Sequence, residues 1–466
     1  MTCMPSSAQA SAIPRPMPDP APVISATLPL RLSIRTSRFV WPECPEASVT
    51  LSAMTSRSAS ELGAVAQSAA LSGMTVLEDG GGIAASYAGK LLADLGADVI
   101  KVERPGGDEV RRMPPFPSDA PGRERSGLHL FLDTNKRSLT LDLESVSGRR
   151  MYRELAHRCG TVITSRHVTE QRMLGLTWED LSTESPELNQ VSITVFGIDT
   201  QREGWHSESL IASLASGISY RIGDPDRAPL GLPYDAPQYQ GGIHAAIAAL
   251  LARRATRESG LGQHAWLSIV DIISNVMAGA GVAAFVFTGQ SRGRAGTHMN
   301  AFYPWQVTPV ADGYYEVITM VDRQWNRFME LMGDPDWQHD ERLQNRWLAF
   351  QHADEIDAFW HPWMAERTKA ELMELFGENH ISFQPVHTIG EVAESEHLQA
   401  RGFWAEVEHP GFDEPVRLPG APYKLSESPW AIRRRAPLLG EHTAEVLSEV
   451  GVEASELARL RRSGIV

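Results

Sequence analysis

The sequence predicts an α/β fold organised around a parallel β-sheet, and two observations support this prediction. The first is a strand at Thr75–Leu77, a glycine turn at Gly80–Gly82, a helix over Ala84–Gly96 and a second strand at Asp98–Glu103. This order makes a βαβ unit, in which the two strands run parallel. The second observation is that strands and helices keep alternating along the next part of the chain.

The first helix is defined by a regular apolar face and by its end. Lys90 and Asp94 lie off this face, whose apolar residues recur at helical spacing: Tyr87, Leu91, Leu92 and Leu95. Many helices end at a residue with left-handed backbone angles, a position that favours a glycine such as Gly96. The second strand follows directly. We therefore expect this helix to pack on the sheet through one face.

Further elements follow in the same alternation. They are a strand at Ser138–Asp142, a helix at Gly148–Cys159, a strand at Thr161–Thr164, a short helix at Trp178–Ser185 and a strand at Asn189–Phe196. Helices dominate from Ser207 to Gly289. Within this region the weakly polar stretch Ile269–Gly289 is predicted to be a buried helix.

A second structural unit is predicted farther along the chain. The turn Asp312–Gly313 leads into alternating strand residues at Tyr314–Ile318, which is typical of a β-hairpin. A helix over Gln324–Met332, a β-rich segment over Phe403–Leu418 and a helical tail from Thr443 follow. A chain of 466 residues also favours two units over a single ordinary core.

The N-terminal segment, up to about Leu71, differs from the rest of the chain. It is rich in Ser, Ala, Pro and Met, shows no sustained hydrophobic period, and lacks the charged and apolar regions of a secretory signal. We expect residues 1–71 to be a disordered extension or to reflect a start codon assigned too early.

Composition and charge exclude several classes of function. The net charge of -15 and the pI near 5.5 argue against a nucleic-acid partner. An anionic cofactor can still bind through a few local cations and helix N-termini. Apolar runs are too short to span a bilayer, so we expect no membrane partner and a cytoplasmic location. With Cys3, Cys44 and Cys159 alone, we predict neither a disulfide framework nor a metal site.

Several sequence blocks, in the same order as in a known family, carry a resemblance. They are Leu92–Asp108 (LADLGADVIKVERPGGD), Asn135–Leu143 (NKRSLTLDL), Leu174–Leu176, Gly260–Gln263, Leu439–Thr443 and the terminal Ser463–Val466. Together they resemble the family III (CaiB/BaiF) CoA-transferases and 2-methylacyl-CoA racemases, of which this chain looks like a divergent member. Family members move coenzyme A between carboxylic acids, or racemise 2-methylacyl-CoA esters.

The resemblance implies a particular organisation of the chain. It implies a large α/β domain built from both ends of the chain (72–295 and 416–466), a smaller α+β domain (296–415) and an interlinked homodimer. The implied small-molecule partners are an acyl-CoA thioester and a carboxylic acid.

The resemblance also implies residues that hold coenzyme A. In the family, residues matching Arg104 and Lys136 contact CoA, and the family's Arg-Pro-Gly segment falls on His167, with Arg166 adjacent. Phosphates require cations and helix N-termini, which fits these residue types. Arg104 follows a strand directly, and Lys136 and Arg137 precede another strand, where we expect ligand-binding loops of a parallel sheet.

The catalytic position follows from the same comparison. Family transferases use an aspartate that attacks the thioester and forms a mixed anhydride, held at a helix start where backbone N–H groups stabilise the oxyanion. The matching slot falls on Gln238, which cannot form an anhydride. Asp235, three residues upstream, is the predicted substitute. In the racemase branch the two proton-transfer slots fall on Glu208, near His206, and again on Gln238.

Three functions remain open on these residues. The first is a CoA-transferase that uses Asp235. The second is an acyl-CoA racemase or isomerase that moves an α-proton through Glu208 or His206. The third is a CoA-thioester-binding paralogue without catalytic activity. Gln238 favours the second and third, whereas the intact family blocks favour the first.

Overall fold

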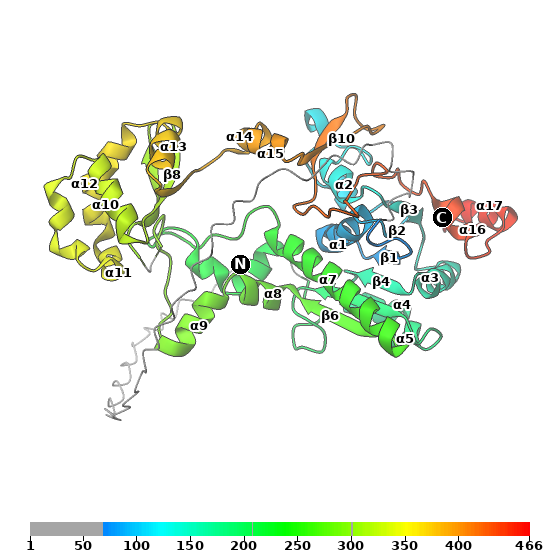
Figure 1. Cartoon of the computed structure of the whole chain (residues 1–466). Coiled ribbons are helices and arrows are strands. Elements are labelled where there is room, and N and C mark those ends of the chain that lie inside the picture. Colours follow the sequence, from blue (N-terminus) through cyan, green and yellow to red (C-terminus); the bar gives the residue numbers. More distant parts are fainter. Residues whose placement is uncertain (1–68, 207, 300–301) are drawn as a thin grey trace, which may run out of the picture. The chain divides into compact units, whose positions relative to one another are not determined.

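A computed structural model describes residues 69–206, 208–299 and 302–466. The predicted α/β fold is confirmed by a six-stranded, wholly parallel sheet with strand order β3-β2-β1-β4-β5-β6 (Figure 1). The strands are β1 (Thr75–Asp79), β2 (Asp98–Glu103), β3 (Arg137–Thr140), β4 (Thr161–Thr164), β5 (Asn189–Thr194) and β6 (His264–Ser268). From β1 the chain first builds strands to one side, and from β4 to the other.

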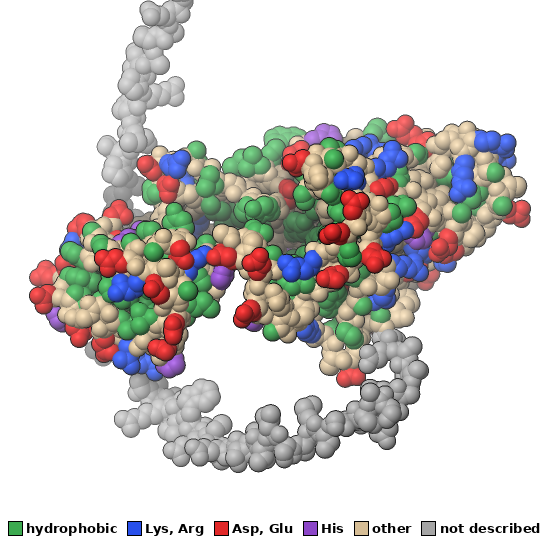
Figure 2. Space-filling view, turned by 90° about the horizontal axis from the view of Figure 1, so that it is seen from above, with side chains coloured by type: hydrophobic (Ala, Val, Ile, Leu, Met, Phe, Trp, Pro, Cys, Tyr) green, Lys and Arg blue, Asp and Glu red, His purple; other side chains and the backbone are tan. Residues whose placement is uncertain are grey.

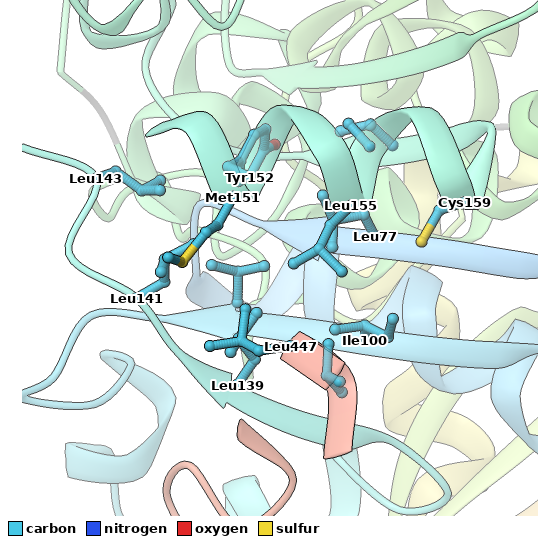
Figure 3. Close-up of a cluster of buried hydrophobic side chains, with 14 of the residues drawn as sticks. Leu77, Ile100, Leu139, Leu141, Leu143, Met151, Tyr152, Leu155, Cys159 and Leu447 are labelled. Carbon is cyan, nitrogen blue, oxygen red and sulfur yellow. The ribbon is translucent and has the colours of Figure 1, made fainter. Parts of the chain in front are cut away.

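Helices cover both faces of this sheet because successive strand residues point to opposite sides. On one face, α1 (Gly82–Asp94) and α7 (Ala236–Ser259) bury alanine-rich surfaces, and α8 (Ile269–Val276) buries isoleucines, against Val76, Val99 and Val191. On the other, α3 (Val146–Cys159) packs on Leu77 and Ile100 (Figure 3).

The C-terminal helices belong to the same core as the first strands. Leu447 of α16 (Thr443–Ser448) and Leu460 of α17 (Ala454–Arg462) lie in the cluster that contains Leu77 and Leu139. Both ends of the described chain therefore build the large α/β unit. Cys159 lies in this cluster as a free thiol, and burial raises its pKa to about 12.

A second core surrounds an antiparallel sheet with strand order β7-β8-β9. Its strands are β7 (Trp305–Val310), β8 (Gly313–Ile318) and β9 (Ser382–Pro385), and the β7–β8 pairing confirms the predicted hairpin. The helices α10 (Asp322–Leu331), α12 (Ala353–Ala365) and α13 (Lys369–Glu378) supply Phe328, Trp360 and Phe376 to this core.

A separate hairpin joins β10 (Trp404–Val407) to β11 (Val416–Pro419). Val407 and Leu418 cluster with Leu130 and with Ala436. The remaining α-helices are α2 (Gly127–Leu132), α4 (Val168–Leu174), α5 (Trp178–Ser182), α6 (Ser209–Ala215), α9 (Gly279–Thr288), α11 (Arg346–Ala349), α14 (Ile389–Ala393) and α15 (Glu396–Ala400). The domain boundaries given above stay a prediction, and residues 1–68 of the predicted extension lie outside the described residues.

The prediction of a buried helix over Ile269–Gly289 is wrong. The segment forms two helices, α8 and α9, bent by 68°. Whereas α8 is buried through Ile269, Ile272 and Ile273, α9 has no buried residue. An apolar composition alone does not show what a helix packs against. Across the described residues, no single helix has the length and apolarity to cross a membrane; α8 and α9 pass that test only jointly, on length and composition.

Candidate active site

A cleft of about 900 Å³ opens at the carboxyl ends of the sheet strands. Its wall includes Gly80–Gly82 after β1, His167 after β4, Ile193–Phe196 at the end of β5, and Asp235 and Gln238 at the start of α7. It lies where the chain leaves β1 and β4 in opposite directions. Such switch points are the usual ligand sites of open parallel sheets. We refer to this feature as the cleft.

The glycine turn lets two loops meet at the floor of the cleft. Gly80 has φ +95°, and a Cβ there would lie 2.2 Å from the backbone nitrogen of Arg166. At Gly81, with φ +73°, a Cβ would lie 2.6 Å from Oδ1 of Asp108. Only glycine fits both the left-handed backbone and these close approaches. The turn therefore fixes the position of the loop that carries His167.

Asp235 precedes the first residue of α7 and is held by one hydrogen bond. Its backbone is left-handed (φ 54°), as is that of Tyr234 (φ 52°). The buried hydroxyl of Ser209 donates to Oδ1 of Asp235 at 2.6 Å. Oδ2 has no hydrogen bond with any described residue, so one oxygen of this carboxylate is anchored and the other is available in the cleft.

The first turn of α7 offers no unused backbone N–H group. Ala236 donates to the carbonyl three residues before it at 3.1 Å, and Pro237 has no N–H. The N–H groups of Gln238 and Tyr239 donate to the carbonyl of Asp235 at 2.8 and 3.2 Å. The expectation that backbone N–H groups at this helix start face an oxyanion is therefore wrong, because the turn ahead of the helix has already satisfied them.

Gln238 lies one turn along the helix from Asp235 and also lines the cleft. Asp235 itself lies outside the helix, so what the two residues share is the wall of the cleft. The side-chain amide of Gln238 makes no hydrogen bond within the described part of the chain, although its backbone is fixed in the helix. It is a neutral group with two donors and one acceptor beside the free oxygen of Asp235.

Glu208, His206 and His167 complete the polar wall of the cleft. Glu208 is exposed, precedes α6, and its carboxylate has no hydrogen bond or ion pair among the described residues. The rings of His206 and His167 stack at 4.6 Å. Nδ1 of His167 accepts the N–H of Thr169 at 3.3 Å and caps α4, which places the proton of the neutral ring on Nε2.

The structure thus brings Asp235, Gln238, Glu208, His206 and His167 together and leaves Arg104, Lys136, Arg137 and Arg166 outside the cleft wall. Arg104 is exposed after β2, and its Nε donates to the carbonyl of Gly107 at 3.2 Å. These placements leave the predicted roles of the residues as predictions.

Arg166 adjoins the cleft but faces the sheet. Its guanidinium pairs with Asp79 at 2.6 Å and with Glu170. Burial opposes the charge of Arg166, but the Asp79 carboxylate outweighs burial and raises the pKa of the guanidinium. Tyr152 donates to the same Asp79 at 3.3 Å. Arg166 therefore ties α4 to β1.

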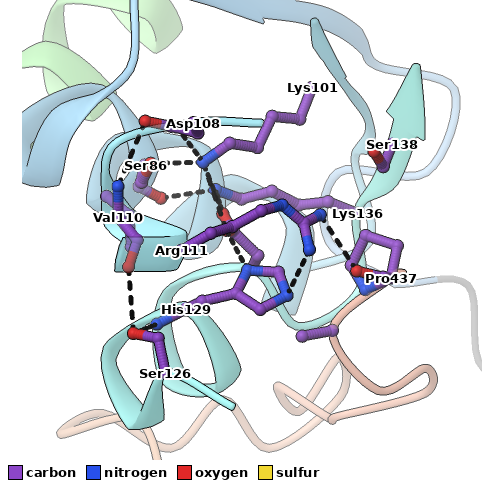
Figure 4. Close-up of polar contacts among 12 residues, drawn as sticks. Ser86, Lys101, Asp108, Val110, Arg111, Ser126, His129, Lys136, Ser138 and Pro437 are labelled. Carbon is purple, nitrogen blue, oxygen red and sulfur yellow. Dashed lines mark hydrogen bonds and ion pairs between the residues drawn. The ribbon is translucent and has the colours of Figure 1, made fainter. Parts of the chain in front are cut away.

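Lys136 lies inside a buried ionic cluster beneath α1 (Figure 4). Its Nζ lies 2.7 Å from Ser86 O, from Oδ1 of Asp133 and from Oε2 of Glu78. Two of these contacts are hydrogen bonds, to Ser86 O and to Asp133, and the third, to Glu78, is an ion pair, so the ammonium group is enclosed by partners within the protein. Contact with a CoA phosphate would require one of these pairs to break.

The same cluster reaches the glycine turn through Lys101. Lys101 Nζ lies 2.7 Å from Asp108 and 3.0 Å from Asp133. Oδ1 of Asp108 accepts the N–H of Gly82 at 3.3 Å. Burial disfavours the charged carboxylates, but Lys101 outweighs it and lowers the pKa of both Asp108 and Asp133. The cluster thereby braces the cleft floor from below.

Arg137 lies at the amino ends of the sheet strands, whereas the cleft lies at their carboxyl ends. It is the first residue of β3 and pairs with Asp98, Glu445 and Glu449 at 2.6, 3.0 and 2.6 Å. The expectation that residues just before this strand lie among ligand-binding loops is therefore wrong. Ligands bind at the carboxyl ends of parallel strands, whereas Arg137 marks an amino end and ties α16 to the sheet.

Two sets of potential metal ligands occur among the described residues, and neither lines the cleft. They are Glu124, His129 and His409, and His298, Asp354 and Asp357. In the first set, the guanidinium of Arg111 lies 2.7 Å from Glu124 and 3.1 Å from His129. That position is therefore already served by a cation of the protein.

Sequence reasoning missed Ser209 and the buried ionic cluster. A serine at a helix start is common as a cap, so nothing in the sequence distinguishes Ser209. The cluster had a signal, because Glu78, Lys101 and Glu103 interrupt strands that are buried on both faces. Such strands are ordinarily continuous runs of apolar residues.

Comparison with known proteins gives consistent matches. A family model described as CoA-transferase family III matches residues 71–443. The chain is 30% identical over 393 residues to a succinyl-CoA:mesaconate CoA-transferase of Haloarcula hispanica, covering 82% of this chain and 97% of that protein. It is 29% identical over 393 residues to a succinyl-CoA:(R)-benzylsuccinate CoA-transferase subunit of Thauera aromatica, covering 82% and 94%.

Two further matches extend this picture. A succinate–glutarate CoA-transferase of Agrobacterium fabrum is 30% identical over 385 residues, covering 82% of this chain and 95% of that protein. Among solved structures, a CAIB/BAIF family protein from Brucella suis superposes with a TM-score of 0.74 at 26% identity, covering 82% of this chain and 100% of that one.

Proposed function

We propose that this chain, which belongs to CoA-transferase family III, transfers coenzyme A from an acyl-CoA thioester to a carboxylic acid, with Asp235 as the nucleophile. One observation carries the assignment of the residue: Asp235 lines the cleft with one oxygen anchored by Ser209 and the other without a partner among the described residues. A nucleophilic carboxylate needs this combination of a fixed direction and a free oxygen.

The proposed reaction proceeds through two anhydrides. Oδ2 of Asp235 attacks the thioester carbonyl carbon, a C–O bond forms, and the C–S bond breaks to release CoA thiolate. The acceptor carboxylate then attacks the Asp235 carbonyl carbon of this anhydride and displaces the donor acid. The thiolate finally attacks the acceptor acyl carbon, which releases the Asp235 carboxylate and the new acyl-CoA. Covalent catalysis of this kind replaces one difficult exchange by easier steps.

We further infer that the acids are dicarboxylic. The relatives' names specify succinate, mesaconate, glutarate and benzylsuccinate, all of which carry a second carboxylate. Arg202 lines the cleft of this chain, and its guanidinium lies 5.6 and 5.3 Å from the ring centroids of Phe196 and Trp205. It forms no ion pair with the residues described. We assign Arg202 to the second carboxylate, because a guanidinium binds carboxylates in a bidentate fashion.

For coenzyme A itself we assign Arg104 as the first phosphate contact. Arg104 is exposed, and its terminal nitrogens have no partner in the described ranges, whereas Lys136, Arg137 and Arg166 carry ion pairs within the protein. His167 also lines the cleft, and its Nε2 is buried and has no described hydrogen-bond partner. Cytoplasmic location remains part of this proposal.

Transfer is tested by incubating the protein with succinyl-CoA and carbon-13-labelled glutarate and measuring labelled glutaryl-CoA by mass spectrometry. Asp235→Asn keeps the shape and tolerates the left-handed backbone, and it should abolish product. Glu208→Gln is the matched control in the same cleft and should retain transfer. Loss of transfer in Glu208→Gln, together with solvent deuterium at the α-carbon of a 2-methylacyl-CoA, would instead favour the racemase alternative.

We also propose that two copies associate through α9. This helix exposes Val286 and Phe287 to 72% and 88%, and Val282 and Phe285 beside them to 52% and 53%. Hydrophobic side chains also interrupt the charged surface on the face shown in Figure 2. A contiguous exposed apolar helix is typical of a protein interface.

A further inference from the structure

Each step of the proposed exchange creates a negative oxygen that needs a hydrogen-bond donor. When a carboxylate or thiolate attacks a carbonyl carbon, the carbonyl oxygen becomes an oxyanion. Donors held in place for this charge are often the largest single contribution to rate, and the loss of one costs about 10²–10³-fold in kcat. The donor must lie close to the attacking oxygen of Asp235.

The backbone around Asp235 does not supply this donor. The N–H groups of Ala236, Gln238 and Tyr239 are already bonded to backbone carbonyls, and Pro237 has none. The hydroxyl proton of Ser209 is donated to Oδ1 of Asp235 itself. At the start of α7, a donor for the oxyanion therefore has to be a side chain that reaches the cleft.

The amide of Gln238 meets each requirement. It lines the cleft together with Asp235, follows it by three residues in the first turn of α7, and has no hydrogen bond to any residue of the described ranges. Its two N–H donors need no proton transfer to act. The helix backbone fixes its origin, since the N–H of Gln238 is bonded to the carbonyl of Asp235 at 2.8 Å.

We propose that Gln238 is a catalytic residue whose Nε2–H donates to the oxyanion formed when Asp235 attacks the acyl-CoA carbonyl. This inference rests on the proposed function. A glutamine suits the position because a second carboxylate one turn from Asp235 would repel both the nucleophile and the oxyanion. The neutral amide leaves Asp235 the only carboxylate among residues 235–239 and stabilises the charge that forms next to it.

The test compares four variants in the succinyl-CoA:glutarate assay. Gln238→Ala should lower kcat by about 10²–10³-fold while KM for succinyl-CoA stays within a few-fold. Gln238→Glu, which matches the size but lacks the N–H donors, should lose as much. Gln240→Ala is the control, because it lies on the same helix outside the cleft wall, and it should keep the wild-type kcat.

The fourth variant distinguishes a donor from a displaced nucleophile. Gln238→Asp should be as impaired as Gln238→Ala if position 238 is a donor. Greater activity of Gln238→Asp, retained when Asp235→Asn is added, would overturn the assignment. Wild-type kcat in Gln238→Ala would also overturn it. Absence of transfer by the wild-type protein, or full activity of Asp235→Asn, would count against the proposed function itself, and the inference would fail with it.

Discussion

The backbone conformation at Asp235 and the hydrogen bond from Ser209 together orient the carboxylate. The left-handed backbone of Tyr234 costs roughly 1–2 kcal/mol, whereas an aspartate such as Asp235 adopts this conformation more readily. A hydrogen bond to a charged group contributes about 1.5–3 kcal/mol, so the Ser209 contact is large enough to offset much of this cost. The strained conformation directs the carboxylate away from the helix axis and toward the cleft.

Removing this contact should therefore impair the reaction more than binding. We predict that Ser209→Ala lowers kcat about tenfold, which corresponds to ~1.4 kcal/mol, and leaves KM for succinyl-CoA unchanged. Ser209→Thr keeps the hydroxyl and should restore most of the rate. Steady-state kinetics of the two variants provide the measurement. Equal loss in both variants would indicate a packing defect instead of a lost hydrogen bond.

Arg202 should determine which acids the enzyme accepts. We predict that Arg202→Gln lowers kcat/KM for glutarate about tenfold or more and leaves kcat/KM for butyrate unchanged, with acetyl-CoA as the donor in both assays. Acetyl-CoA has no second carboxylate, so its KM reports on coenzyme A alone. A raised KM for acetyl-CoA with unaltered discrimination between the two acids would assign Arg202 to a CoA phosphate and contradict the prediction.

At the residue scale, the candidate catalytic residues predicted from the sequence line the cleft, whereas the predicted lysine and arginine contacts to coenzyme A do not. Asp235, Gln238 and Glu208 were assigned by the family resemblance, and all three line the cleft, although their roles stay predictions. Lys136 could not be placed, because its side chain runs under α1 to Glu78 and Asp133, and such long-range ion pairs leave no local pattern.

At the scale of the elements, the β10–β11 hairpin contains a buried histidine, His409, whose pKa is lowered from its usual value. His409 follows β10, is 4% exposed, and its Nδ1 accepts the N–H of Gly411 at 3.1 Å. Burial, with additional repulsion from His129 and Arg435, lowers the pKa of His409 to about 4. The hairpin therefore packs around a neutral imidazole.

The sign of the effect follows from proton linkage. Between pH 6.5 and 4 the unfolded chain binds the His409 proton and the folded chain does not, so stability falls as the pH falls through this window. We predict that His409→Gln reduces the loss of unfolding free energy between pH 7 and pH 5 by about 2 kcal/mol. Urea unfolding at both pH values measures it. An identical loss in the wild type and the variant would contradict the assignment.

The hydrophobic pattern of the sequence predicts some helices and strands of this fold but not others. The βαβ units and the β7–β8 hairpin follow local patterns and were predictable. The start of α7 was not, because a strained turn ahead of it extends the helix back to Ala236. The separation of α8 from α9 was missed because both are apolar, and only tertiary contacts distinguish the buried helix from the exposed one.

At the scale of the whole molecule, the exposed face of α9 should set the oligomeric state. We predict that the wild-type protein sediments as a dimer and that Phe287→Asp shifts it to the monomer, because a buried unpaired charge opposes association. Leu261→Asp changes an apolar residue that is 63% exposed and lies outside α9, so it serves as the control. Analytical ultracentrifugation reports both. A monomeric wild type, or a dimeric Phe287→Asp variant, would contradict this.

The overall architecture was predictable because several ordered blocks and an alternating pattern of strands and helices agree on it. The assembly of one core from β1 and α16 was implied only by the family resemblance, since Leu77 and Leu447, which lie in the same core cluster, are separated by most of the chain. The position of the cleft then follows from the strand order, because the switch between β1 and β4 is a property of the whole sheet.

The most direct test of the central claim is a search for the acyl–enzyme anhydride on Asp235. The protein would be incubated with succinyl-CoA, treated with hydroxylamine, and analysed by intact-mass and peptide mass spectrometry. We predict that hydroxylamine converts the Asp235 anhydride into a hydroxamate at that residue, with no hydroxamate in Asp235→Asn. A hydroxamate at another carboxylate, or none in a protein that transfers coenzyme A, would contradict the account.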